Sequence, residues 1–303
     1  MLFKSLRMAR FFIIAAFGCA GIAHADAPPT CQQNSRNCVE VGQWQLALGV
    51  GLGLRTNPVV DGETIPLILL PEISYYGERF FLDNLDIGYT LHQSDTQMLN
   101  MLLTPGYDQL FFSRWDPQNF FVETTTLSTA VVPSGMLAPQ QTAGERWTVE
   151  DSVDLNDLHE RRMAAMAGFE YAVALGPVDG YAQALQDVAA VHNGHELRLG
   201  LGKAWRRGGN DFALAGGATW QSAELLHYYY GVETSEVSRL SAAYQAPSGI
   251  SGFIKLDWSR PVSEHWSWRG TFQYKKLSTS ITDSPIVNDD KVITAFLGGV
   301  YHF

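Results

Sequence analysis

Long apolar runs are missing from this chain once its first 25 residues are set aside. No later stretch reaches the roughly 18 apolar residues that a membrane-spanning helix needs. Charge is also sparse, since Lys, Arg, Asp and Glu together make up 17% of the chain, and 31 acidic residues outnumber 21 basic ones. Because nucleic-acid binding requires basic patches, this composition argues against nucleic-acid binding, and we expect no nucleic-acid partner.

Cysteine is scarce as well, with three in the chain. Cys31 and Cys38 would remain after export, and an oxidising compartment favours a small disulfide loop between them, with two free thiols as the alternative. Cys31 and Cys38 have no further ligands nearby at the spacing of a zinc site. The same holds for His192 and His195, which stand three residues apart elsewhere in the chain. The sequence therefore predicts no metal and no cofactor.

The N-terminus has the pattern of an export signal. A basic head (Lys4, Arg7, Arg10) precedes an apolar run over residues 11–17 and the cleavage pattern Ala23-His24-Ala25. We expect residues 1–25 to be a signal peptide, 26–42 a periplasmic N-terminal segment, and 43–303 the folded domain. An exported chain without spanning helices can be periplasmic, secreted, or a barrel of the Gram-negative outer membrane.

The stretch WQLALGVGLGL, residues 44–54, alternates strictly between large apolar and small or polar residues. Its glycines do not match the G-x-G-x-x-G spacing of a dinucleotide site, because Leu54 stands three residues after Gly51. A period of two is the period of a β-strand. We expect Gly49, Gly51 and Gly53 to line the crowded inner side of that strand.

The same alternation recurs along the chain, with turn signals between the runs. It is seen at residues 65–76, 80–91, 162–175, 196–205, 211–220, 252–258 and 266–276. Uninterrupted apolar faces opposite small or polar ones are typical of a transmembrane barrel solvated by outer-membrane lipid, with a soluble β-sandwich as the alternative. We predict an all-β, antiparallel, up-and-down barrel of about twelve strands.

The count of twelve rests on a parity argument. Both termini lie on one side only if the strand number is even. Eleven alternating runs can be read directly, which is an odd number. A strand through residues 108–115, DQLFFSRW, supplies the twelfth and places the long stretch 116–156 outside, with the loops 55–64, 231–247 and 279–290.

Aromatic residues provide two further signals. The chain ends in Phe303 with Tyr301 at the same parity, which resembles the insertion signal read by the barrel-assembly machinery. Aromatics near strand ends predict girdles at the two membrane interfaces. This set comprises Trp44, Trp205, Trp220, Tyr228–Tyr230, Trp258, Trp266 and Trp268.

Charged residues on the small-residue faces are candidates for the lumen. They are Glu72, Asp86, Glu170, Glu196, Arg198, Lys255, Asp257, Arg269 and Lys275. Mixed signs favour paired networks that brace a narrow barrel, and a selective pore is the alternative. We find no catalytic motif such as G-x-S-x-G or H-E-x-x-H, so the sequence predicts no enzyme.

Several segments resemble the MipA/OmpV family, the MltA-interacting proteins of the outer membrane. They are residues 55–91, LTPGYDQLFFSRWDPQN, YYYGV at 228–232, Ser284–Val287 and the closing YHF. The resemblance implies an outer-membrane barrel. For at least one member it implies a scaffold that joins a lytic transglycosylase to a murein synthase in peptidoglycan turnover. A porin-like channel and an outer-membrane lipid hydrolase are the alternatives.

Overall fold

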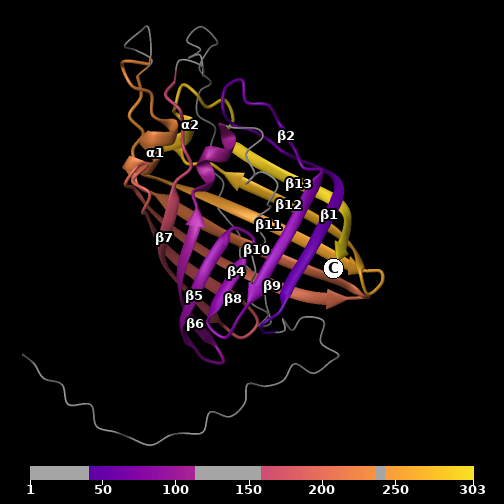
Figure 1. Ribbon diagram of the computed structural model, residues 1–303. Helices are drawn as coiled ribbons and strands as arrows, with labels where there is room; N and C mark the ends of the chain where they lie inside the picture. Colours follow the sequence, from indigo (N-terminus) through magenta and orange to yellow (C-terminus); the bar gives the residue numbers. More distant parts are fainter. Residues whose placement is uncertain (1–40, 113–157, 237–242) are drawn as a thin grey trace, which may run out of the picture. The chain divides into compact units, whose positions relative to one another are not determined.

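A computed structural model describes residues 41–112, 158–236 and 243–303. The expected signal peptide, the pair Cys31 and Cys38, and the stretch 116–156 lie outside these residues. The described part of the chain is one antiparallel sheet that curves until its ends meet (Figure 1). β13 pairs with β1 from Ala47↔His302 to Arg55↔Thr294, so the sheet is a closed barrel.

The strands follow one another around the wall in chain order, and only β2 stands outside this ring. β2 has two residues and pairs with β1 alone, which leaves twelve wall strands. Their bounds are β1 Trp44–Arg55, β2 Ile65–Pro66, β3 Leu69–Tyr76, β4 Phe80–Asp83, β5 Asp86–Gln93, β6 Gln97–Pro105, β7 Ala165–Ala174, β8 Asp179–Asp187, β9 His195–Arg207, β10 Asn210–Gln221, β11 Gly249–Pro261, β12 Trp266–Lys276 and β13 Lys291–His302.

The two ends of the barrel differ in their connections. One end, the short-turn end, carries the start of β1, the end of β13 and turns such as 94–96, 175–178 and 208–209. The opposite end, the long-loop end, carries the connections 56–64, 106–164, 222–248 and 277–290. Short turns on one side and longer loops on the other are typical of outer-membrane barrels.

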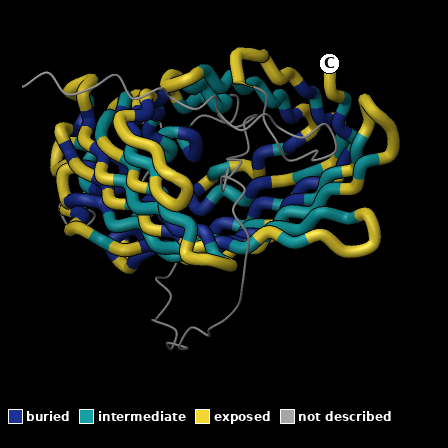
Figure 2. The backbone as a smooth tube through the Cα atoms, turned by 90° about the horizontal axis from the view of Figure 1, so that it is seen from below, coloured by how far each residue is buried: buried dark blue, intermediate teal, exposed yellow. Residues whose placement is uncertain are grey.

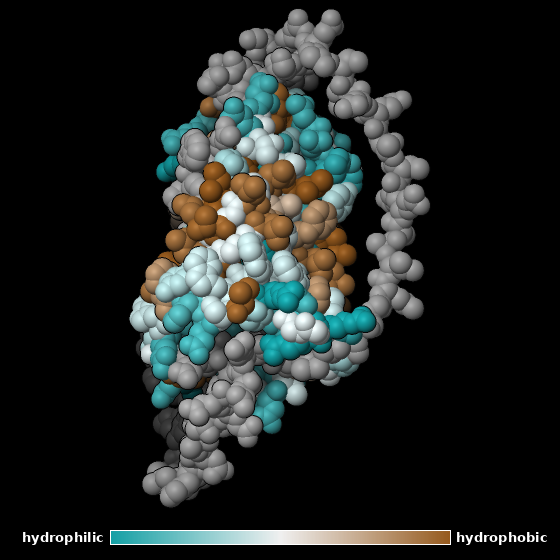
Figure 3. Space-filling view, turned by 90° about the vertical axis from the view of Figure 1, so that its right-hand side faces the viewer, coloured by the Kyte–Doolittle hydropathy of each residue, from teal (hydrophilic) through white to brown (hydrophobic). Residues whose placement is uncertain are grey.

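Side-chain alternation gives the barrel an apolar outer belt. On β1, Leu46, Val50 and Leu52 are exposed while Ala47 and Arg55 are buried. Exposed and less exposed positions alternate along the strands around the ring (Figure 2). The face shown in Figure 3 has an apolar band between two polar zones. Such a belt is what a wall solvated by hydrocarbon requires.

The predicted number of strands is confirmed, but one of the strands is not where we expected it. Residues 107–111 form a 3-10 helix, η1 (Tyr107–Phe111), so the described part of the predicted strand 108–115 is not a strand. The additional strand comes from the run 80–91, which breaks into β4 and β5 at Asn84. Asn84 has φ +54°, a left-handed conformation that asparagine tolerates better than most residues.

Three short helices gather at the long-loop end. They are η1, α1 (Ala223–Tyr230) and α2 (Thr279–Thr282) (Figure 1). No helix among the described residues is long and apolar enough to cross a bilayer. The helices pack with inward strand residues in one apolar cluster, which includes Leu70, Leu102, Phe111, Leu226 and Ile281.

Glycine allows β1 and β13 to approach closely where the barrel closes. A Cβ on Gly51 would lie 2.4 Å from the Leu297 carbonyl oxygen and 2.5 Å from the Cα of Gly298. Both contacts are with the backbone, which cannot rotate away as a side chain can. Any larger residue at position 51 therefore pushes the closing strands apart.

We predict that Gly51→Val prevents or strongly weakens barrel closure, since overpacking costs roughly 1–3 kcal/mol. The measurement is the fraction of heat-modifiable, folded protein on unboiled gels after refolding into detergent. Gly252→Ala is the matched control, because a Cβ there meets nothing nearer than 3.7 Å. Equal folding of both variants would contradict the closure argument.

Candidate functional site

A buried group of polar side chains lies where α1, η1 and β10 meet. The Tyr230 hydroxyl donates to Asp108 Oδ1 over 2.8 Å, and Gln221 Nε2 donates to Asp108 Oδ2 over 2.7 Å. All three residues are buried. Burial, reinforced by the nearby Asp108 carboxylate, raises the pKa of Tyr230 well above its usual range, so the hydroxyl keeps its proton.

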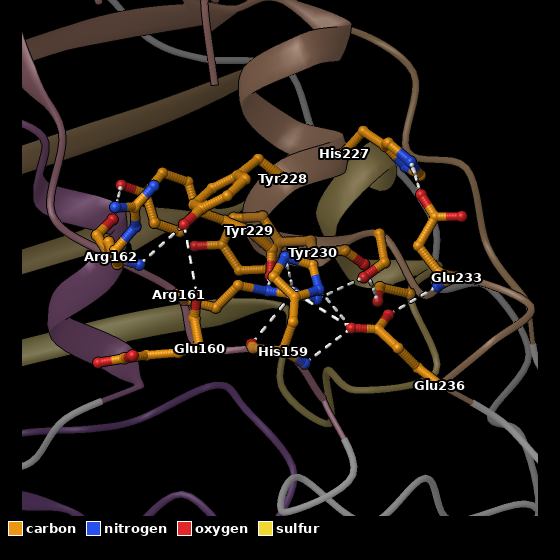
Figure 4. Close-up of polar contacts among 12 residues, drawn as sticks. His159, Glu160, Arg161, Arg162, His227, Tyr228, Tyr229, Tyr230, Glu233 and Glu236 are labelled. Carbon is orange, nitrogen blue, oxygen red and sulfur yellow. Dashed lines mark hydrogen bonds and ion pairs between the residues drawn. The ribbon is translucent and has the colours of Figure 1, made fainter. Parts of the chain in front are cut away.

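Arg161 secures the C-terminal end of α1. Its guanidinium donates to the carbonyl oxygens of Tyr229 (3.3 Å) and Gly231 (2.9 Å), and lies 3.5 Å from Glu236 (Figure 4). Burial lowers the pKa of Arg161, and the Glu236 carboxylate opposes that shift. A cation at this position complements the free carbonyls and the negative end of the helix dipole.

The other tyrosines of α1 bind the segment before β7. The Tyr229 hydroxyl donates to the Arg162 carbonyl over 3.0 Å, and the Arg162 N–H donates to the Tyr228 hydroxyl over 2.9 Å (Figure 4). With Tyr230 bound to η1, three consecutive side chains of α1 contact both described ends of the connection 106–164. We call the helices η1, α1 and α2, together with the segment 158–164 that contacts α1, the loop plug.

His192 belongs to the same end of the barrel. Its Nδ1 accepts the Gly194 N–H over 2.9 Å, and its ring packs near Tyr228 and Tyr229. Nε2 is buried with no hydrogen-bond partner among the described residues. Burial lowers the pKa of His192, and the carboxylates of Asp187, Asp108 and Glu196 oppose that shift.

Most of the charged residues proposed for the lumen have polar partners. Arg198 donates to Glu196 over 2.5 Å, and Lys255 lies 3.3 Å from Asp257. Glu170 accepts hydrogen bonds from Asn100 (2.9 Å) and Gln183 (2.7 Å). Arg198 also lies over the Tyr107 ring at 5.3 Å and so connects the wall to η1. Asp86 and Lys275 are half-buried on β5 and β12.

The ion pair between Glu72 and Arg269 joins two strands that are not neighbours in the sheet. Glu72 is on β3 and Arg269 on β12, and both β13 and β1 lie between these strands. Side chains converge on the concave face of a curved sheet and diverge on its convex face. The contact is therefore consistent with inward orientation, although the lumen role of the full set stays a prediction.

Sequence reasoning misplaced one group and missed another. Tyr229 and Tyr230 were expected in an interface girdle, but they are buried on α1 inside the loop plug. Trp44, Trp266 and Trp268 are exposed near the short-turn end. Asp108 was missed as a site residue because its partners are more than 110 positions away along the chain. No local pattern reports such a contact.

Comparison with known proteins identifies the family of this chain. The profile of the MipA family, described as MltA-interacting protein MipA, matches residues 48–303. The chain belongs to the MipA family. It is 25% identical to the MltA-interacting protein of Escherichia coli over 289 residues, with 94% of each chain covered.

Further relatives place this MipA-family barrel in the outer membrane. It is 23% identical to outer membrane protein OmpV of Vibrio cholerae, covering 92% of this chain and 94% of that protein. It is 24% identical to outer membrane protein Omp26La of Vibrio anguillarum, covering 77% and 85%. Among solved structures, a loop-deletion mutant of Vibrio cholerae OmpT aligns over 87% of this chain at 8% identity and a TM-score of 0.34. The chain is an outer-membrane β-barrel of the MipA/OmpV type.

Loss of the Tyr230 hydroxyl should loosen the loop plug. Tyr230→Phe leaves one oxygen of a buried carboxylate without its donor, and we expect unfolding to become easier by about 1.5–3 kcal/mol. Urea unfolding in lipid vesicles measures the change. Tyr171→Phe is the control, because Tyr171 is exposed on the outward side of β7. Equal stability of the two variants would show that the Asp108 contact contributes nothing.

Proposed function

We propose that this barrel is a non-catalytic scaffold that binds a murein-processing partner at its short-turn end. The observation that carries the proposal is the loop plug. The long-loop end holds three features: the buried Asp108 carboxylate with its two donors, Arg161 at the end of α1, and a continuous apolar cluster. A barrel packed in this way is suited to binding rather than to passing solutes.

The nature of the partner is supported by the relatives. The name of the Escherichia coli relative states an interaction with MltA. The family resemblance implies a lytic transglycosylase and a murein synthase as partners. Murein lies in the periplasm, and the short turns of outer-membrane barrels face that compartment. Exposed apolar side chains at those turns, Leu175 and Val262, are candidate contacts.

The paired charges argue against the porin-like alternative. A selective pore needs charges that are free to meet passing ions. Here Glu72, Glu196 and Asp257 each have a basic partner. The Glu72–Arg269 pair links β3 to β12, and the other two pairs lie within the single strands β9 and β11.

The lipid-hydrolase alternative has one observation in its favour. His302 Nε2 lies 2.9 Å from Ser267 Oγ near the short-turn end. A serine nucleophile also needs a group that orients the histidine and a site for the oxyanion. No acidic side chain contacts His302 among the described residues, so the geometry supports binding better than hydrolysis.

Photo-cross-linking in intact envelopes tests the scaffold. We expect a photoreactive residue at Val262 or Leu175 to form adducts with a murein-processing enzyme, identified by mass spectrometry. Asp61, exposed in the loop after β1, is the matched position at the opposite end and should give no such adduct. Adducts from Asp61 alone, or from none of the three positions, would contradict the proposal.

A further inference from the structure

Two exposed arginines flank one asparagine on neighbouring strands at the short-turn end. Arg207 of β9 pairs with Asn210 of β10. Asp211 of β10 pairs with Ser259 of β11, which places Arg260 on the other side of Asn210. Paired Cα atoms of antiparallel strands lie about 5 Å apart, so the two long side chains can reach one small anion between them. We call Arg207, Asn210 and Arg260 the arginine row.

Alternation along the strands shows that the arginine row is on the outer face of the wall. On β9, Leu201 is exposed at the parity of Arg207, while Gly202 is buried at the other parity. On β11, Leu256 is exposed at the parity of Arg260. Both arginines therefore extend from the side of the wall that meets lipid.

An aromatic row lies beside the arginine row, one outward position further along the strands toward the apolar belt. Phe212 of β10 pairs with Trp205 of β9 and with Trp258 of β11. The rings of Trp205 and Phe212 stack with their centroids 5.5 Å apart. The Trp258 indole N–H donates to Asn210 Oδ1 over 3.0 Å and so links the two rows. Such rings prefer the boundary between hydrocarbon and headgroups, so the arginine row lies at headgroup depth.

The inward and outward arginines of this end differ in their partners. Arg206 is on the inner face of β9 and pairs with Asp211. In the part of the chain that the structure describes, no acidic side chain pairs with Arg207 or Arg260. Lys203, on the outward face of β9, adds a third positive charge to this sector. An anion from outside the chain can therefore neutralise the arginine row.

The rest of the wall does not combine aromatic rings with positive charge in this way. From β1 to β8, the outward positions of the described strands hold no lysine or arginine. Aromatic residues are present there at the short-turn end, as in the contacts of Tyr75 with Trp44 and Phe80. The sector from β9 to β11 is thus chemically distinct from the opposite side of the barrel (Figure 1).

We propose that the arginine row binds the phosphate of an anionic phospholipid in the membrane leaflet on the periplasmic side. Guanidinium groups form charge-assisted hydrogen bonds with phosphate oxygens. The aromatic row contacts the glycerol and the first carbons of the acyl chains. Three outward positive charges disfavour a zwitterionic headgroup, because they repel its ammonium. This inference goes beyond the scaffold role and does not depend on it, since the two arginines face lipid.

Native mass spectrometry of the purified, folded chain tests the proposal without any partner protein. The chain is released from detergent micelles that hold equal amounts of phosphatidylglycerol and phosphatidylethanolamine. We expect it to retain phosphatidylglycerol in preference to phosphatidylethanolamine. The double variant with Arg207→Gln and Arg260→Gln should retain phosphatidylglycerol several-fold less, because both guanidinium contacts with the phosphate are lost.

A second double variant controls for net charge. Arg79→Gln and Lys276→Gln also remove two positive charges, and both positions are exposed and outside the sector from β9 to β11. This variant should retain phosphatidylglycerol as the unmodified chain does. Equal losses in the two double variants, or equal retention of the two lipids by the unmodified chain, would overturn the proposal.

Two further measurements keep the test decisive. If millimolar inorganic phosphate displaces phosphatidylglycerol, the row is a site for a free anion and the proposal fails. Mobility of unboiled samples on gels reports whether each variant is folded. If the double variant of the arginine row does not fold, the single variants Arg207→Gln and Arg260→Gln decide, and each should lower retention of phosphatidylglycerol. Unchanged retention in both single variants would contradict the proposal.

Discussion

Pairing of every backbone donor and acceptor is the constraint on which this structure depends. Hydrocarbon offers no hydrogen bonds, so a sheet can cross a membrane only if its two edges meet. Here they meet between β1 and β13, where Gly51 and Gly298 let the backbones approach. Closure divides the side chains into an outward, exposed apolar set and an inward set that holds small and polar residues together with buried apolar ones such as Leu102 and Phe296.

Charged side chains on the inward faces of the strands need polar partners. An unpaired charge is expensive to bury. The structure pairs them within strands, as in Glu196 with Arg198, and across strands, as in Glu72 with Arg269. At the long-loop end, Asp108 is satisfied by Tyr230 and Gln221. Together these contacts give the buried and half-buried charges polar partners and join loop residues at the long-loop end to one another.

The sequence alone predicted the strands that show a clear alternation of apolar and polar residues. Alternation over residues 44–54 located β1 and gave the outward set, and the parity of the chain ends led to an even strand number. The sequence did not predict two strands, β4 and β5, in the run 80–91, because the alternation of apolar residues continues on both sides of Asn84. The parity argument placed a strand at DQLFFSRW. The contacts of Asp108 with Gln221 and Tyr230, which accompany a helix there, are visible only after folding.

The central claim is that packed loops and paired charges close this barrel to solutes. Ion-current recording across planar bilayers that contain the folded chain tests it most directly. The account predicts a current no larger than that of the protein-free bilayer over a range of applied voltages. Stable, stepwise currents from the unmodified chain would show an open lumen and contradict it.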